Sequence, residues 1–359
     1  MFRQGGVKRV PRRPRSVAAL LLIAIACTAM AAAPSVPPRT SSHPPGNAQG
    51  DGNAQGDGRA EGALHLQLDA PAFAPEKIKL TIYLPPGYRH GARRYPVLYA
   101  NDGQDMAAVG LQPTLARLYR GHAIEPVIVV AIDMLADRAS GYGLSDRASA
   151  HSLVGGSVIG PIGTRAQDYS AWVAATLVPY VDAHFRTRRS SRERAMLGWS
   201  LGALNAFNLG WQYPEVFGRV GAFSPSFWLA ADRTSAGTVQ RTRLAQAMVD
   251  RGPRRAGLKM WVAVGTAEET KDRDGDRIND TVDDVQDLLE GYRGTDGFRA
   301  RGLKQLGYSI NMDYAGHPSR RADATLFRLQ GGVHNQASWK RMLPVFLRWA
   351  YGRHRQKPL

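Results

Sequence analysis

Arg194-Ala-Met-Leu-Gly-Trp-Ser-Leu-Gly-Ala-Leu-Asn205 is the stretch of sequence that decides the fold. It begins as a short apolar strand, turns at Ser200 and continues as a helix. Glycines two residues on either side of a serine are typical of a sharp strand-to-helix turn, because a side chain at those positions would clash. The pentapeptide Gly198–Gly202 is common by chance, so its strand–turn–helix context carries the prediction that Ser200 is a nucleophile.

Strands and helices alternate around this stretch, which predicts an α/β fold with a mostly parallel central sheet flanked by helices. Apolar runs typical of buried parallel strands and segments with helical spacing support it. We expect strands over 95–100, 126–132, 194–197, 220–223, 260–264 and 325–329, and helices over 169–185, 203–213 and 338–350. Residues 64–68 and 77–84 alternate apolar and polar side chains like antiparallel edge strands.

The charge of the chain is high but dispersed. The 359 residues carry a formal net charge of +17, with 43% hydrophobic and 21% charged residues, a composition ordinary for a globular protein with a core. Six of the basic residues lie within residues 1–33, which contain no acid. The other arginines form no basic helix and no stripe interleaved with aromatic residues. We therefore expect a basic surface and no nucleic-acid partner.

The N-terminus has the pattern of an export signal. Residues 1–33 contain a cationic stretch, an apolar run and then small residues that suit signal peptidase, so we predict a signal peptide and a periplasmic or secreted protein. The apolar run is shorter than the roughly 20 residues of a membrane span. Cys27, the single cysteine, is a candidate for lipidation, but the residues before it lack the leucine of a lipoprotein signal. Simple cleavage is favoured, which leaves no thiol chemistry in the mature chain.

A linker is predicted between the signal peptide and the folded domain. Residues 34–62 are rich in proline, glycine and small polar residues and contain a doubled hexapeptide, Gly-Asn-Ala-Gln-Gly-Asp, over 46–57. Such a composition cannot bury a core and is typical of a flexible segment. The α/β domain is therefore expected over residues 63–353.

The nucleophile requires a base, and the base requires an orienting carboxylate. In this fold class the chain order is serine, acid, histidine. His334 lies in Gly331-Gly-Val-His-Asn335, directly after a predicted strand, where an α/β sheet carries its chemistry. His317, in a Gly-His-Pro loop, and His354, in a basic tail, lack this position. We therefore predict His334 as the base.

The acid and the oxyanion hole follow from the ends of two other predicted strands. Glu268 and Glu269 come shortly after the strand over 260–264, and either could orient the histidine; we favour Glu268. An oxyanion hole takes two backbone N–H groups, one of them from the residue after the nucleophile, which is Leu201. Gln104, in the loop after the strand over 95–100, is the candidate for the second donor.

Four motifs in this order carry a resemblance to a known family. They are Tyr95-Pro-Val-Leu-Tyr-Ala-Asn-Asp-Gly-Gln104, Gly198-Trp-Ser-Leu-Gly202, Phe223-Ser-Pro-Ser-Phe-Trp228 and Gly331-Gly-Val-His-Asn-Gln-Ala-Ser-Trp339. Together they resemble the Putative esterase family of α/β-hydrolases, which includes enterobactin-type siderophore esterases, relatives of esterase D and mycolyltransferases of the antigen 85 type. The resemblance spans residues 77–350. A segment from Arg138 to Gly143 also resembles a family loop that borders the active site.

The resemblance implies an α/β-hydrolase fold and acyl transfer from an ester, with Ser200, His334 and an acid near Glu268 as the triad. It also supports Gln104 and Leu201 as oxyanion donors. Members of the family use either aspartate or glutamate as the acid, and no cofactor is implied for catalysis. The substrate class is a small-molecule or saccharide ester.

Three functions follow from these residues: a carboxylic ester hydrolase, an acyltransferase that uses the same triad, and a non-catalytic, calcium-stabilised binding module. The third is disfavoured because every catalytic group is present. Trp199 and Trp228 are interpreted as a pocket wall for a planar acyl group, or else as packing residues, which is the commoner fate of tryptophan. The identity of the ester and the oligomeric state stay open.

An aspartate-rich stretch follows the predicted acid. Carboxylates recur at positions 1, 3, 5, 9 and 12 of this stretch, as Asp272, Asp274, Asp276, Asp280 and Asp283. Hard cations such as Ca²⁺ take six or more oxygen ligands, and alternate positions of a tight loop supply them. The spacing resembles the calcium repeats of thrombospondins, although Arg277 stands where those repeats have glycine. The sequence predicts either a structural calcium site or a solvated acidic insertion.

Overall fold

The structure is a computed structural model, and it describes residues 62–353. The predicted signal peptide, Cys27 and the predicted linker up to residue 61 lie outside the described residues. Within the described range, no helix combines the length and the apolar character that crossing a membrane requires.

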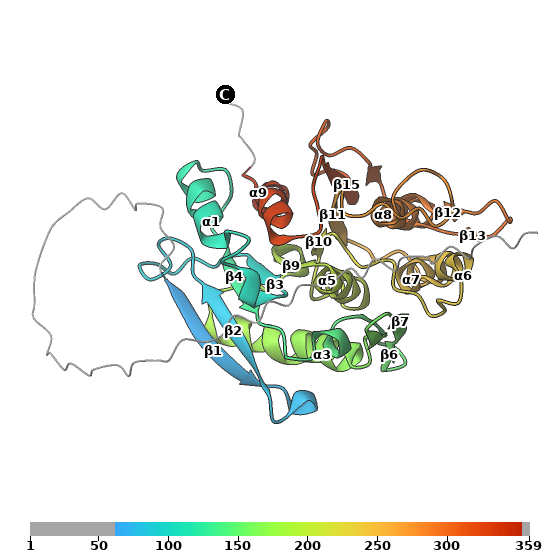
Figure 1. The fold of residues 1–359 in the computed structure, drawn as a ribbon. Helices are drawn as coiled ribbons and strands as arrows, with labels where there is room; N and C mark the ends of the chain where they lie inside the picture. Colours follow the sequence, from blue (N-terminus) through green and yellow to red (C-terminus); the bar gives the residue numbers. More distant parts are fainter. Residues whose placement is uncertain (1–61, 354–359) are drawn as a thin grey trace, which may run out of the picture. The chain divides into compact units, whose positions relative to one another are not determined.

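A nine-stranded sheet forms the centre of the described domain (Figure 1). Its strands are β1 (Ala63–Asp69), β2 (Lys77–Tyr83), β3 (Val97–Ala100), β4 (Ile128–Ile132), β9 (Arg194–Trp199), β10 (Arg219–Phe223), β11 (Lys259–Gly265), β14 (Ile310–Asn311) and β15 (Ala324–Leu329). Their order is β1-β2-β4-β3-β9-β10-β11-β15-β14. All neighbours from β4 to β14 are parallel, whereas β1 and β2 pair antiparallel. The predicted parallel sheet is confirmed.

Helices and short ribbons complete the domain. The helices are α1 (Leu111–Arg120), α2 (Arg138–Gly141), α3 (Ala166–Trp172), α4 (Val178–His184), α5 (Leu201–Gln212), α6 (Ala236–Thr242), α7 (Leu244–Arg251), α8 (Asp280–Glu290) and α9 (Gln336–Tyr351). Short helical turns are η1 (Pro71–Phe73), η2 (Gly103–Asp105), η3 (Val173–Leu177), η4 (Ser191–Glu193) and η5 (Leu303–Leu306). The ribbons pair β5 (Leu144–Asp146) with β6 (His151–Leu153), β7 (Gly155–Ser157) with β8 (Gly160–Ile162), and β12 (Tyr292–Arg293) with β13 (Arg299–Ala300).

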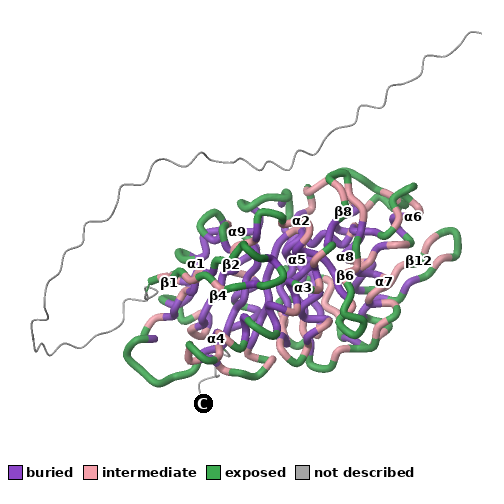
Figure 2. The backbone as a smooth tube through the Cα atoms, turned by 90° about the horizontal axis from the view of Figure 1, so that it is seen from below, coloured by how far each residue is buried: buried purple, intermediate pink, exposed green. Residues whose placement is uncertain are grey.

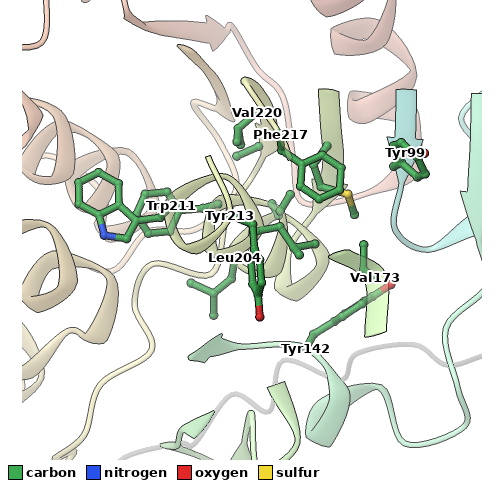
Figure 3. Close-up of a cluster of buried hydrophobic side chains, with 14 of the residues drawn as sticks. Tyr99, Tyr142, Val173, Leu204, Trp211, Tyr213, Phe217 and Val220 are labelled. Carbon is green, nitrogen blue, oxygen red and sulfur yellow. The ribbon is translucent and has the colours of Figure 1, made fainter. Parts of the chain in front are cut away.

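The helices lie in two layers, one on each face of the sheet. α1 and α9 cover one face, and their apolar side chains share a core cluster with alternate residues of the strands. α3 and α5 lie on the other face, where Leu204 and Trp211 of α5 belong to one buried cluster with Phe217, Val220 and Tyr99 (Figure 3). Because α5 packs against the middle of the sheet, its residues are buried nearly all round. Figure 2 shows this buried interior surrounded by exposed loops.

Two predicted elements differ in detail from the structure. The strand over 77–84 pairs antiparallel as expected, but β2 lies between β1 and β4, so of the two predicted edge strands β1 alone lies at an edge of the sheet. The apolar side chains of β2 share one face of the strand, and they are buried because this face packs into the core cluster that includes residues of α3. The helix expected over 169–185 is present as α3, a π-helical turn and α4 in direct succession.

Candidate active site

Ser200 lies on the turn between β9 and α5 at the carboxyl end of its strand. Its backbone has φ 56° and ψ −124°, a conformation that residues other than glycine rarely adopt. A Cβ atom on Gly198 would lie 2.1 Å from the carbonyl oxygen of Gly202, and one on Gly202 would lie 2.5 Å from Asp102 Oδ2. Gly198 is therefore required by the close approach of the backbone at the turn, and Gly202 by the close approach of the buried Asp102 carboxylate.

His334 and Glu268 come together at the ends of two neighbouring strands. Glu268 follows β11, and His334 lies between β15 and α9. The distance from His334 Nδ1 to Glu268 Oε2 is 2.8 Å. The carboxylate is buried, with 1% of its side chain exposed, whereas 40% of the imidazole side chain is exposed. A charged acceptor in a buried site holds an imidazole strongly, so the ring orientation is determined by Glu268.

The alternative acid, Glu269, has a different partner. Its Oε1 accepts a hydrogen bond from the Thr281 hydroxyl at the start of α8. Glu268 instead contacts the histidine, since the turn after Gly265 points its side chain back toward the strand end, where Gly265 N donates to Oε1 at 2.6 Å. Of the two glutamates that the sequence left open, Glu268 is the one in contact with His334.

Ser224 is a part of this site that the sequence analysis missed. Its hydroxyl donates to Glu268 Oε1 at 2.6 Å and accepts a hydrogen bond from Trp339 Nε1 at 2.9 Å. The rings of Trp339 and His334 meet edge to face, with centroids 5.4 Å apart and planes at 82°. Ser224 directly follows β10 and has φ 47°, so its position after a strand inside a family motif was the available signal.

The order of the strands brings the site residues side by side. Ser200, Ser224, Glu268 and His334 follow β9, β10, β11 and β15, which are consecutive neighbours in the sheet. Ser200 N donates to Phe223 O, and Ser226 N donates to Ser200 O, so the serine turn is bonded to the end of β10. No Ser200–His334 hydrogen bond forms among the described residues. Catalytic contacts of this kind are often long without a bound substrate and tighten when one binds.

The two candidate oxyanion donors both lie at helix starts. Leu201 is the first residue of α5 and Gln104 the second residue of η2, so their N–H groups precede the first intrahelical hydrogen bonds. Between these two segments lies Asp102, which has φ 55° and is buried. Arg138 binds its carboxylate with two hydrogen bonds, from Nε at 2.7 Å and Nη2 at 2.9 Å. This bidentate pair ties α2 to the loop that carries Gln104.

The structure corrects the pocket-wall interpretation of Trp199. Only 1% of this residue is exposed, because it is the last residue of β9 and its ring stacks on Trp339 at 5.6 Å and 18°. Its Nε1 donates to Asp105 Oδ2 at 3.0 Å. Trp199 is therefore a packing residue beneath the site. Trp228 is half-buried, with the Arg233 guanidinium 5.4 Å from its ring centroid.

The five aspartates of the predicted metal loop do not all lie together in the structure. Carboxylate oxygens of Asp272, Asp274 and Asp276 all lie within 4.8 Å of one another on the surface. Asp280 does not join them, because its Oδ1 accepts from Arg273 N at 2.7 Å and its Oδ2 faces the Arg273 guanidinium at 3.4 Å. Asp283 is buried on α8 and is not a member of the surface group.

A family model matches most of the described domain. The model of the Putative esterase family matches residues 72–300, which include Ser200 and Glu268 and end before His334. The chain belongs to the Putative esterase family. The family resemblance and the α/β-hydrolase fold predicted from the sequence are thereby confirmed.

Curated relatives match a part of this esterase domain. Uncharacterized protein YbbA of Bacillus subtilis (strain 168) is 24% identical over 156 residues, which is 42% of this chain and 57% of the relative. Uncharacterized protein YjcH of the same organism is 25% identical over 151 residues, which is 42% of this chain and 56% of the relative. The chain thus spans little more than half the length of the curated relatives it matches.

Solved structures share the esterase fold over four-fifths of the chain. A ferulic acid esterase has a TM-score of 0.55 at 15% identity and covers 82% of this chain and 98% of its own. The enterobactin esterase FES from Shigella flexneri has a TM-score of 0.54 at 18% identity, and the match covers 80% of this chain and 59% of the esterase. The BES protein from Bacillus cereus has a TM-score of 0.51 at 15% identity, and the match covers 82% of this chain and 96% of the BES protein. At these identities the likeness concerns the fold.

Proposed function

We propose that this esterase-family chain is an exported serine carboxylic ester hydrolase with Ser200, His334 and Glu268 as its triad. The observation that carries the proposal is the 2.8 Å contact between His334 Nδ1 and Glu268 Oε2, at the same end of the sheet as the strained turn of Ser200. A buried carboxylate that orients a partly exposed imidazole next to a nucleophile is the arrangement that acyl transfer requires.

The proposed reaction uses the two nitrogens of His334 differently. Because Glu268 accepts at Nδ1, the neutral ring carries its proton there and its Nε2 lone pair is available to Ser200. Nε2 takes the hydroxyl proton as Ser200 Oγ attacks the ester carbonyl carbon, and the carbonyl oxygen becomes an oxyanion. The N–H groups of Leu201 and Gln104 stabilise that oxyanion.

The same imidazole then serves as an acid. Nε2–H protonates the leaving alkoxide, the carbonyl–oxygen ester bond breaks, and an acyl-enzyme remains on Ser200. Water, deprotonated by His334 Nε2, attacks the acyl carbon through a second oxyanion. The bond from this carbon to Ser200 Oγ then breaks, His334 Nε2–H returns the proton to Oγ, and the carboxylic acid is released. No metal or cofactor takes part in these steps.

The test combines a fluorophosphonate probe with hydrolysis of short acyl nitrophenyl esters. The parent chain is expected to take the label once, and Ser200→Ala to lose it together with hydrolysis by at least about 10³-fold. Ser319→Ala, in the loop before β15, should keep both. Labelling that persists in Ser200→Ala would contradict the proposal. An ester panel with siderophore lactones, feruloyl sugars and acetyl sugars then defines the substrate class.

Hydrolysis and acyl transfer on this triad differ in their acceptor. We expect the free acid as the product with or without an added alcohol or sugar. A new ester that forms in proportion to the acceptor would identify an acyltransferase instead.

Export is proposed from the sequence of residues 1–33. The full gene expressed in a bacterial host should yield a chain shortened by about this segment outside the cytoplasm, detected by mass spectrometry of fractionated cells. A full-length chain that stays in the cytoplasm, or one that carries lipid on Cys27, would overturn simple cleavage.

A further inference from the structure

The two candidate oxyanion donors belong to separate segments of the chain. Gln104 lies in the loop after β3, and Leu201 begins α5, which follows β9. Within residues 62–353 neither N–H group donates to an acceptor in the protein, so both are available to a ligand. Two donors stabilise one oxyanion only where their positions are fixed, because a displacement of about 1 Å costs on the order of 10²-fold in rate. The contacts that join these two segments therefore bear directly on the proposed reaction.

Asp102 adopts a backbone conformation that needs support from its neighbours. Its φ of 55° and ψ of 50° are left-handed, which is unfavourable for a residue with a Cβ atom. The Asp102 N–H donates to the Tyr142 hydroxyl at 2.9 Å. The Asp102 carboxylate accepts from Arg138 Nε at 2.7 Å and from Arg138 Nη2 at 2.9 Å. The backbone that leads into Gln104 is thus held at two points by α2 and its C-cap residue.

The guanidinium of Arg138 also contacts the turn of the proposed nucleophile. Its Nη2 donates to Trp199 O at 3.3 Å, and Trp199 directly precedes Ser200. One guanidinium therefore bridges the loop of one oxyanion donor and the turn that carries the other. The donor directions of a guanidinium are fixed in one plane, so such a bridge specifies the relative position of the two segments more closely than a flexible ammonium would.

Asn101 makes a second connection between the same two segments. It is fully buried, and its Nδ2 donates to Gly202 O at 2.9 Å and to Asn205 Oδ1 at 3.2 Å. The Tyr169 hydroxyl donates to Asn101 Oδ1 at 2.8 Å, which fixes the orientation of the amide. The first turn of α5 is therefore tied to the residue that directly precedes Asp102. Buried side-chain networks in which each member has its partners hold a single arrangement.

We propose that Arg138 is a positioning residue which, through Asp102, sets the distance and direction between the N–H groups of Gln104 and Leu201. The proposal rests on the proposed function, since it concerns the oxyanion that forms during ester hydrolysis. Arg138 transfers no proton, because a guanidinium stays charged, and it acts through geometry alone. The aligned donors stabilise the charged oxygen of the transition state more than the neutral ester. Loss of Arg138 therefore lowers kcat and leaves KM nearly unchanged.

The experiment measures hydrolysis of nitrophenyl butyrate and inhibition by butylboronic acid, whose tetrahedral adduct with a nucleophilic serine mimics the oxyanion intermediate. We expect Arg138→Ala to lower kcat by about 10²-fold, to keep KM within about threefold of the parent and to weaken inhibition by about 10²-fold. Arg241→Ala is the control, because it removes an exposed guanidinium that pairs with Asp296 at the surface. This control should match the parent in all three quantities.

A double variant separates positioning from the pairing of buried charges. Arg138→Ala leaves the buried Asp102 carboxylate without its counter-ion, so the unfolding midpoint should fall by about 3 °C or more. Arg138→Ala combined with Asp102→Asn removes both charges and keeps a side chain that tolerates the left-handed conformation. The midpoint of this double variant should recover most of the loss, whereas its kcat should stay about 10²-fold below that of the parent.

Two outcomes would overturn the positioning role. One is a double variant whose kcat recovers together with its midpoint, since the pair would then only neutralise charge. The other is an Arg138→Ala chain with the kcat and the boronic acid affinity of the parent. A parent chain without Ser200-dependent hydrolysis would instead contradict the proposed function, and with it the role of Arg138. The comparison of the parent with Ser200→Ala therefore tells the two failures apart.

Discussion

Glu268 receives hydrogen bonds on both of its carboxylate oxygens. Ser224 and Gly265 N occupy Oε1, and His334 occupies Oε2. A buried carboxylate held at three points has little freedom to rotate, so it orients the histidine without an entropic loss during the reaction. Glu269, one residue further on, has a structural partner in Thr281.

The two glutamates therefore make a matched pair for mutation. Glu268→Gln should lower kcat by about 10²–10⁴-fold, because the amide no longer stabilises the imidazolium that forms in the transition state. Glu269→Gln, which makes the same chemical change one residue later, should stay within about threefold of the parent. Steady-state hydrolysis of a nitrophenyl ester measures both. Equal losses in the two variants would contradict the assignment of Glu268.

Ser224 positions Glu268 rather than reacting itself. Ser224→Ala should lower kcat by about tenfold and cost about 1–3 kcal/mol of stability, because Trp339 Nε1 then lies buried without an acceptor. Trp339→Phe removes that donor, so the double variant should recover part of the lost stability. Chemical denaturation of the two single variants and the double variant measures this coupling. Strictly additive losses would show that the hydroxyl and the indole act independently.

The charge of Asp105 makes the stability of the folded chain depend on pH. Burial is the main cause that raises its pKa, and the hydrogen bond from Trp199 offsets part of the rise. A carboxyl group whose pKa is higher in the folded state stabilises the fold at low pH, and that contribution is lost as the pH rises through the folded pKa.

Asp105→Asn should consequently be as stable as the parent at pH 7, or more stable. The amide oxygen of the new side chain still accepts the hydrogen bond from Trp199 Nε1. The parent loses stability as the pH rises from about 4 through the raised pKa of Asp105, and the variant does not, because it has no carboxyl group to ionise at this position. Asp105→Ala, which leaves the indole N–H without an acceptor, should lose about 1–3 kcal/mol. Unfolding midpoints of the three chains across this pH range measure the effect. A parent whose stability rises over that range would contradict the sign.

At the scale of elements, the site depends on the contact between the ends of β11 and β15. Thr266 N donates to Leu329 O, and Ala267 N donates to Gly332 O, so the two loops are joined by backbone hydrogen bonds. A Cβ atom on Gly265 would lie 2.3 Å from Gly332 O. Glycine is therefore the residue that allows the Glu268 loop and the His334 loop to approach.

Gly265→Ala should separate these two loops. Because the clash is with backbone rather than with a flexible side chain, we expect a loss of about 1–3 kcal/mol and a tenfold or greater loss of kcat. Gly91→Ala is the control, since its Cβ would have only Gly87 O in reach, at 4.0 Å, and should leave both quantities unchanged. Thermal unfolding and ester hydrolysis are measured on the same preparations. A Gly265→Ala chain with full activity would show that the loops tolerate separation.

The elements around Ser200 were predictable because their signals are local. The turn of the proposed nucleophile lies within five residues, and the histidine and glutamate candidates follow apolar strands. The hydrogen bond between Trp339 and Ser224 was not predictable, because it joins residues 115 positions apart. Trp199 was interpreted from its neighbour Ser200, but successive residues of a strand point to opposite faces, and its face is covered by α9. Similarly, the acidic stretch that contains α8 did not reveal the buried face of that helix. The aspartates on this face pair with Arg243 and Arg273, which come from other segments.

At the scale of the molecule, one sheet separates two hydrophobic clusters. Each central strand contributes to both: in β9, Met196 belongs to the cluster under α3 and α5, and Leu197 to the cluster under α1 and α9. Neither cluster can lose its helices without exposing one face of the shared sheet. The two halves of the core are therefore coupled through the strands, and we expect the described domain to unfold in a single transition.

Met196→Ala and Leu197→Ala test this coupling from opposite faces of one strand. Both side chains are fully buried, so each truncation should cost about 2–5 kcal/mol and lower the midpoint by about 3–8 °C. If the sheet couples the clusters, each variant keeps one transition, and circular dichroism and tryptophan fluorescence report the same midpoint. Leu64→Ala, on the exposed edge strand β1, should change the midpoint little. A second, lower transition confined to one variant would show instead that the two helical layers unfold independently, with the sheet as a boundary between them.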